Sequence, residues 1–132
     1  MKSSTPYSWA KPFKSERDIC EIVCNSICGN LLLNDQFPSL EVWKERILKS
    51  ATVTICVFNS NINTALIRVL VIQNEGGPVE LTVPPGNTLS ATVDDAESII
   101  VSRIGVGRTE GKFNLEVCFP FFCNDKHKYK KC

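Results

Sequence analysis

The chain has 132 residues, of which fifteen are lysine or arginine and fourteen are aspartate or glutamate. This length suits one domain with its own core. The near-neutral balance argues against a nucleic-acid-binding protein, which needs clustered excess cations to displace counterions. No apolar run approaches the roughly twenty residues of a membrane-spanning helix, and the start shows no signal-peptide stretch. We therefore expect neither a nucleic acid nor a membrane as partner.

The first part of the chain divides into an arm and a cysteine segment. Residues 1–18 are polar and contain two prolines, which predicts a flexible N-terminal arm. Residues 19–50 follow and begin with ICEIVCNSIC. The three thiols of this stretch lie four residues apart, so they share one face of either a helix or a strand. They are Cys20, Cys24 and Cys28.

The remainder of this segment predicts a short helix at about 38–49. Ser39 is a candidate N-cap, and lysine and arginine suit the later turns. The apolar residues recur near helical spacing and are Leu40, Trp43, Ile47 and Leu48. No other helix is expected.

From residue 51 the apolar pattern changes to a period of two, which predicts strands. The clearest examples are ATVTICVFN at 51–59 and GKFNLEVCFPFF at 111–122. Between them, NTALIRVLVIQ is apolar on both faces apart from Arg68, which predicts burial on two sides or cover by a neighbouring subunit. Shorter strands are expected in PVELTV, TLSATV and ESIIVSRIGV, the last two separated by an acidic turn at Asp94 and Asp95.

Six or more short strands with glycine, proline and asparagine turns predict a β-sandwich or jelly roll. This core spans residues 51–123 and is followed by a basic C-terminal tail at 124–132.

The seven cysteines are an odd number, which leaves at least one without a partner in the same chain. Cys56 and Cys118 lie on strand faces opposite the apolar stripes. A free cysteine usually behaves as a small buried hydrophobe, so outward-facing thiols indicate that something covers or bonds them. Bonds within the chain and bonds to another copy both stay open. The candidates for either are Cys20, Cys24, Cys28, Cys56, Cys118, Cys123 and Cys132.

Metal and catalytic sites are not expected. Cys118 and Cys123 have the spacing C-x4-C, but neither they nor the N-terminal trio sit in a zinc-knuckle glycine pattern, and C-x-x-C is absent. The single histidine, His127, lies in the lysine-rich tail, so a serine or cysteine triad has no evident base. We expect no metal, no cofactor and no enzyme activity.

The block from about residue 51 to 122 resembles the endospore-appendage subunits of Bacillus-type spore formers. The resemblance rests on ATVTICVFN, ALIRVLVIQ, ELTVPPGNTLSATVDDAESIIV and FNLEVCF, and VPPGNTLSATV followed by SIIV is its most specific part. It implies a single eight-stranded jelly roll with a flexible N-terminal connector, whose subunits stack by sheet augmentation into rings or fibres. The expected fold class is therefore an all-β jelly-roll β-sandwich with that connector and a short helical insert.

The resemblance also implies disulfides between the connector cysteines of one subunit and the strand cysteines of its neighbours. Cys56 and Cys118 would then be acceptor thiols, and the trio beginning at Cys20 would supply the donors. The chain departs from the fibre-forming members because it has no adjacent Cys-Cys pair in residues 1–18. Both a fibre subunit and an accessory ring or anchor therefore stay open.

The leading hypothesis is a non-enzymatic subunit or anchor of a spore-surface appendage. It would self-assemble by strand augmentation and intermolecular disulfides. Its expected partners are copies of itself, related appendage subunits and exosporium proteins. Synthesis in the mother-cell cytoplasm, followed by release through lysis, would require no signal peptide. The alternative is a jelly-roll binding module for a glycan or a spore-coat protein, which predicts exposed aromatic residues grouped near one set of loops.

Overall fold

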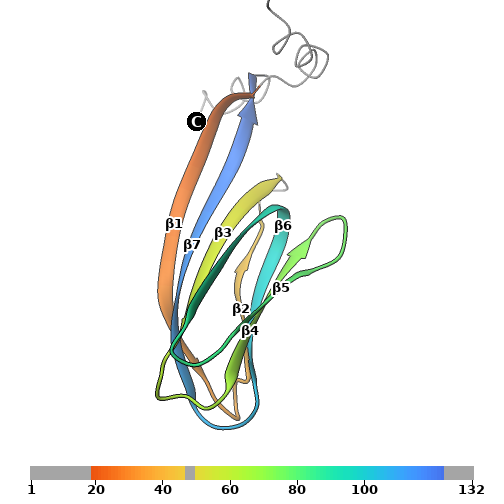
Figure 1. The fold of residues 1–132 in the computed structure, drawn as a ribbon. Coiled ribbons are helices and arrows are strands. Elements are labelled where there is room, and N and C mark those ends of the chain that lie inside the picture. Colours follow the sequence, from red (N-terminus) through yellow and green to blue (C-terminus); the bar gives the residue numbers. More distant parts are fainter. Residues whose placement is uncertain (1–18, 47–49, 124–132) are drawn as a thin grey trace, which may run out of the picture. The chain divides into compact units, whose positions relative to one another are not determined.

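A computed structural model describes residues 19–46 and 50–123 of the protein (Figure 1). The expected arm at 1–18 and the tail at 124–132 lie outside these ranges. The chain forms two compact units. Among the described residues, the first unit contains 19–23 and 120–123, and the second contains 24–119. Within the described ranges, no helix is long and apolar enough to cross a membrane.

The described residues form seven β-strands. In chain order they are β1 (Ile19–Leu33), β2 (Ser39–Lys44), β3 (Ala51–Asn59), β4 (Leu66–Gln73), β5 (Val79–Val83), β6 (Thr88–Ile104) and β7 (Thr109–Phe122). Their hydrogen-bonded order is β1-β7-β3-β6-β4-β5, and β2 also pairs with β6. The all-β prediction is confirmed, and the arrangement is jelly-roll-like.

The long strand β6 connects the two layers of the larger unit. Its first half, as far as Ala96, pairs with β3. Its second half pairs with β4 on one side and β2 on the other. One layer therefore has the order β1-β7-β3-β6 and the other β2-β6-β4-β5, and the continuous sheet folds back on itself around one core (Figure 1).

The acidic pair at the middle of β6 marks this change of layer. We expected a turn there, but Asp94 and Asp95 lie inside one continuous strand. Asp95 has a φ of 55°, a left-handed conformation that aspartate tolerates better than most residues. Its carbonyl accepts from the Asn74 N–H at 3.0 Å, and its carboxylate accepts from the Asn74 side-chain amide at 2.9 Å. These bonds hold the bend of β6 at an irregularity, where the register shifts in both the β3–β6 and the β4–β6 ladders.

The core follows the period-two pattern. In β3, Val53, Ile55 and Val57 are fully buried, as the alternation predicted. In β4 the face containing Ile67 and Val69 is fully buried, whereas the opposite face is half-buried. The second face of β4 is thus only partly covered within the chain.

The helix expected at 38–49 is wrong where the structure describes it. Residues 39–44 form the strand β2, which pairs with 98–102 of β6. Ser39, the expected N-cap, forms a hydroxyl–hydroxyl hydrogen bond of 2.9 Å with Ser102. Leu40, Val42 and Trp43 pack against the core from this strand. The local apolar pattern fits either a helix or a strand, and pairing with β6 decides for the strand. Ile47 and Leu48 lie outside the described residues.

Two buried asparagines join strands from both layers at one end of the core. The Asn59 amide donates to the carbonyl oxygens of Ala65 and Val83, at 3.0 and 2.9 Å. The Asn63 amide donates to Asn59 Oδ1 at 2.6 Å, and Asn63 Oδ1 accepts from the Glu110 N–H at 3.1 Å. This network satisfies backbone groups that the strand ladders leave open.

Candidate functional site: the cysteine-bearing face

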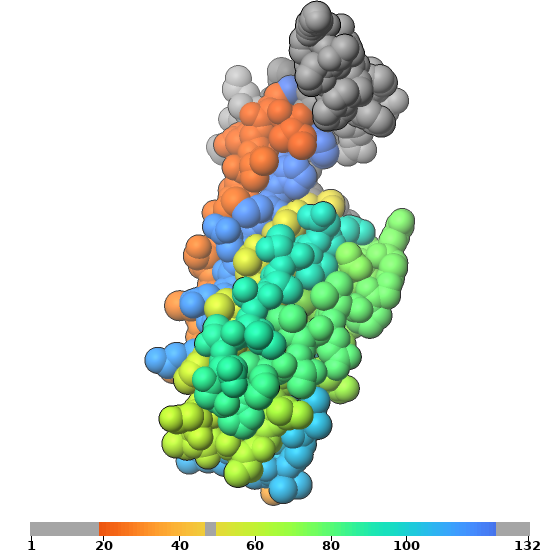
Figure 2. Space-filling view, viewed as in Figure 1, coloured from red at the N-terminus to blue at the C-terminus, as the bar shows by residue number. Residues whose placement is uncertain are grey.

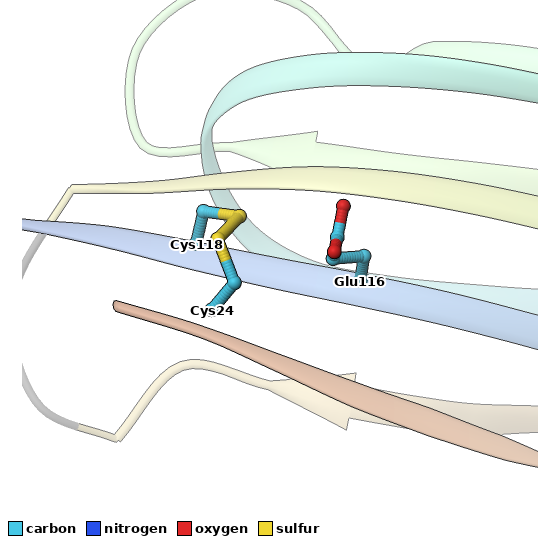
Figure 3. Close-up of side chains that lie close together, drawn as sticks. All are labelled: Cys24, Glu116 and Cys118. Carbon is cyan, nitrogen blue, oxygen red and sulfur yellow. A yellow bond between two sulfur atoms is a disulfide. The ribbon is translucent and has the colours of Figure 1, made fainter. Parts of the chain in front are cut away.

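Two disulfides connect β1 to β7 and to the residue that directly follows β7. Cys24 of β1 bonds to Cys118 of β7 within the larger unit (Figure 3). Cys20 bonds to Cys123 within the smaller unit. Both bonds join residues that are about a hundred positions apart, with sequence separations of 94 and 103. In this structure two members of the N-terminal trio are therefore bonded inside their own chain.

The pairing of Cys24 with Cys118 follows from the adjacency of β1 and β7. Neighbouring antiparallel strands place directly opposite side chains about 5 Å apart, which is within disulfide range. A second contact supports the same register, since a Cβ on Gly29 would lie 2.9 Å from the Phe113 ring. Gly29 is five residues after Cys24, and Phe113 is five residues before Cys118, as the register of antiparallel strands requires.

A carboxylate lies beside the Cys24–Cys118 bond. The ligand atoms of Cys24, Glu116 and Cys118 all lie within 4.8 Å of one another. Figure 3 shows the sulfur atoms joined between the two strands, with Glu116 nearby on β7. Two thiolates and a carboxylate would suit zinc, but the bonded sulfurs no longer provide thiolates. In the oxidised chain this group is a disulfide with an acidic neighbour.

Two cysteines remain free in the described part of the chain. Cys28 of β1 is exposed, and Cys56 of β3 is half-buried. Both line one open hollow of about 290 Å³ on the outer face of the layer. Its other lining residues are Ser26, Ile27, Thr54, Asn114, Leu115 and Glu116.

The sheet register explains why both thiols meet at this hollow. Cys56 is directly opposite Asn114 in the β3–β7 ladder. Cys28 is four residues after Cys24, and Asn114 is four residues before Cys118. Cys28 on β1 is therefore opposite Asn114 on β7, on the side of β7 away from β3. The three side chains thus form one row across three strands. Figure 2 shows these strands in the order orange β1, blue β7, yellow β3 and teal β6.

The structure therefore separates the predicted cysteines into groups. Four are bonded in pairs, two are free in one hollow, and Cys132 lies outside the described residues. Cys56 and Cys118 do lie on the face opposite the apolar stripe, and neither is fully buried. The sequence alternation places Asn114 and Glu116 on the same strand face as Cys118, but it does not show that they lie beside Cys28 and Cys56. The strand alternation contains that signal once β1, β7 and β3 are known to be adjacent.

The opposite layer has a different outer surface. Its exposed side contains half-buried aliphatic residues from β4 and from the second half of β6. They include Leu66, Leu70, Ile72 and Ile100. Within the described residues, β1 and β5 end the strand order, β2 pairs with β6 alone, and the first half of β6 pairs with β3 alone. Each layer therefore has strand edges open to pairing.

Comparisons with known proteins support one family. The family described as endospore appendages matches residues 13–121. A solved structure of Bacillus endospore appendages, described as disulfide-linked pili, aligns with a TM-score of 0.64 and 12% identity, covering 76% of this chain and 88% of that chain. No curated protein matches.

A weaker likeness is to the NLP core of Drosophila. Its TM-score is 0.40 at 12% identity, over 74% of this chain and 98% of that one.

Proposed function

Because the chain belongs to the endospore-appendage family, we propose that it is a non-enzymatic structural subunit or anchor of a spore-surface appendage. It assembles with copies of itself and with related appendage subunits. The family match over residues 13–121 carries this proposal, and the likeness to Bacillus disulfide-linked pili supports it. Exosporium proteins are further proposed partners.

Strand pairing between copies supplies the first contact. Within residues 24–46 and 50–119, the outer sides of β1, β2, β5 and the first half of β6 border no further strand, and such sheet edges can pair with a strand of a neighbouring copy. The half-buried aliphatic residues on the outer side of β4 and β6 offer apolar area that a second copy can cover. Both features favour association between sheets over binding of a small ligand.

Disulfides between copies then make the contact permanent. Cys28 is free and exposed, Cys56 is free and half-buried, and Cys132 adds a third thiol by sequence. A covalent link converts a reversible contact into one whose loss is governed by a slow rate. The two bonds within the chain stabilise each subunit before it assembles.

The binding-module alternative has less support. It requires exposed aromatic residues grouped at one set of loops, but Trp43 packs against the core. Among the described residues, the exposed aromatic side chains are Phe37, which follows β1, and Phe58, inside β3. They come from different kinds of element, so they do not form the expected loop cluster.

One experiment tests the proposal directly. The purified full chain, oxidised in air, is examined by negative-stain microscopy and on non-reducing gels. We expect rings or filaments and a ladder of covalent oligomers that collapses with reductant. A particle that stays monomeric under both conditions, and binds a glycan or coat protein in that form, would contradict self-assembly.

A further inference from the structure

The hollow beside Asn114 contains two thiols that cannot bond to each other. Cys28 and Cys56 lie on β1 and β3, with β7 between them. Two strand spacings put their backbones about 10 Å apart. A disulfide needs Cα atoms within about 7 Å, so this distance excludes a bond without backbone movement. Each thiol must find a partner elsewhere or stay reduced.

Counting the remaining cysteines narrows the choice of partner. Four of the seven are already paired as Cys20–Cys123 and Cys24–Cys118. Residues 1–18 contain no cysteine, so this segment of another copy offers no thiol. The thiols that remain in each copy are Cys28, Cys56 and Cys132. A disulfide that joins two different cysteines from two copies must use Cys132, unless it joins Cys28 directly to Cys56.

We propose that the hollow receives the C-terminal tail of a second copy, and that its Cys132 forms a disulfide with Cys28. This inference rests on the proposed self-assembly and specifies its covalent link. Cys28 is favoured over Cys56 because it is exposed and lies on the edge strand β1, where an incoming chain arrives first. Cys56 is half-buried between neighbouring strands.

The composition of the tail suits this surface. Residues 124–132 read NDKHKYKKC, with four lysines and one aspartate. The exposed carboxylate of Glu116 lines the hollow, within reach of a lysine on the entering segment. The nine residues after Cys123 span about 30 Å when extended, which equals about six strand spacings across a sheet.

The covalent step is a balanced oxidation. The Cys28 and Cys132 thiols lose two protons and two electrons, and one S–S bond forms. Dioxygen accepts the electrons. Alternatively, a low-molecular-weight disulfide accepts them by exchange through a mixed disulfide, releasing two small thiols.

Isotope mixing tests whether the bond joins two copies. Equal amounts of reduced full-length protein, one unlabelled and one labelled with ¹⁵N, are mixed and then oxidised in air. Cleavage before aspartate separates Cys28 in fragment 18–34 from Cys56 in fragment 35–93, and releases the tail as 125–132. We expect the tail on fragment 18–34, with about half of the linked products carrying mixed label.

Serine variants provide the matched controls. Cys28→Ser and Cys132→Ser should each reduce the covalent oligomers at least tenfold, whereas Cys56→Ser should leave them unchanged. A tail attached to fragment 35–93, or linked products without mixed label, overturns the inference. Filaments that form without any tail link also overturn it but leave the proposed function standing. If the wild-type chain forms no assembly, the proposed function itself fails.

Discussion

The outer faces of the two layers differ although both layers share one core. The β1-β7-β3 layer presents thiols, threonines, an asparagine and a carboxylate around its hollow. The layer of β2, β4, β5 and the second half of β6 presents half-buried aliphatic side chains. Side chains on these faces add little to the packed core. Their chemistry is therefore free to serve contacts with other molecules, covalent on one side and apolar on the other.

The largest expected loss of unfolding free energy distinguishes an inward-facing from an outward-facing residue of β6. Ile99 is fully buried, and its neighbour Ile100 lies half-buried on the outer side. Ile99→Ala should lower the free energy of unfolding by about 2–5 kcal/mol, because it leaves a cavity. Ile100→Ala should cost less than about 1 kcal/mol. Urea unfolding of both variants checks this, and equal losses would contradict the two-layer assignment.

The next effect concerns the covalent link on the thiol-bearing face. Replacing both Cys24 and Cys118 by serine should lower the free energy of unfolding by about 2–3 kcal/mol, because the unfolded chain loses the small ring closed between the two bonds, while Cys20–Cys123 still closes the long loop. The control is Cys28→Ser, an exposed free thiol, with an expected change within about 0.5 kcal/mol. Thermal unfolding without reductant compares the two variants, and a double variant as stable as the wild type would speak against the bond.

A smaller loss of unfolding free energy is expected when the hydrogen bonds of Asn59, which join strands of the two layers, are removed. Asn59→Ala removes the donor to the Ala65 and Val83 carbonyls and should cost about 1–3 kcal/mol. Asn61→Ala, at an exposed position in the same turn region, is the control and should be nearly neutral. Hydrogen exchange at the start of β4 and the end of β5 would locate the loosened region. Uniform protection in both variants would count against the network.

The smallest effect on the fold should accompany a large effect on assembly. Leu70→Glu places a charge on the aliphatic outer face, where the side chain is half-buried. We expect a loss of about 1 kcal/mol in unfolding free energy, with filaments reduced in reducing buffer. Asn61→Glu, at an exposed position of the turn between β3 and β4, is the control. Undiminished assembly of the Leu70 variant would show that this face contacts no other copy.

Much of the fold can be predicted from local alternation, because one buried face imposes a period of two. ATVTICVFN predicts β3 with its observed bounds. The failures occur where distant partners decide the structure. SLEVWK fits a helix until β6 is available to pair with it, and Asp94–Asp95 suggests a turn until Asn74 supplies hydrogen bonds that keep the strand continuous.

The cysteine pairings depend even more on distant contacts. Four-residue spacing places the trio on one face but does not reveal that β7 is the neighbouring strand. Cys24 and Cys118 are 94 positions apart, so their proximity is a property of the topology. The same topology separates Cys28 from Cys56 by one intervening strand, a fact that no local pattern contains.

The Cys20–Cys123 bond has a mechanical consequence. Tension applied between the segment before Cys20 and the segment after Cys123 passes through the two bonded sulfur atoms. The polypeptide between these residues then carries no load, because the covalent shortcut holds its two ends together. Reduction of this bond alone would transfer the load to the Cys24–Cys118 bond, so the polypeptide between those two residues would bear force only after both bonds are reduced.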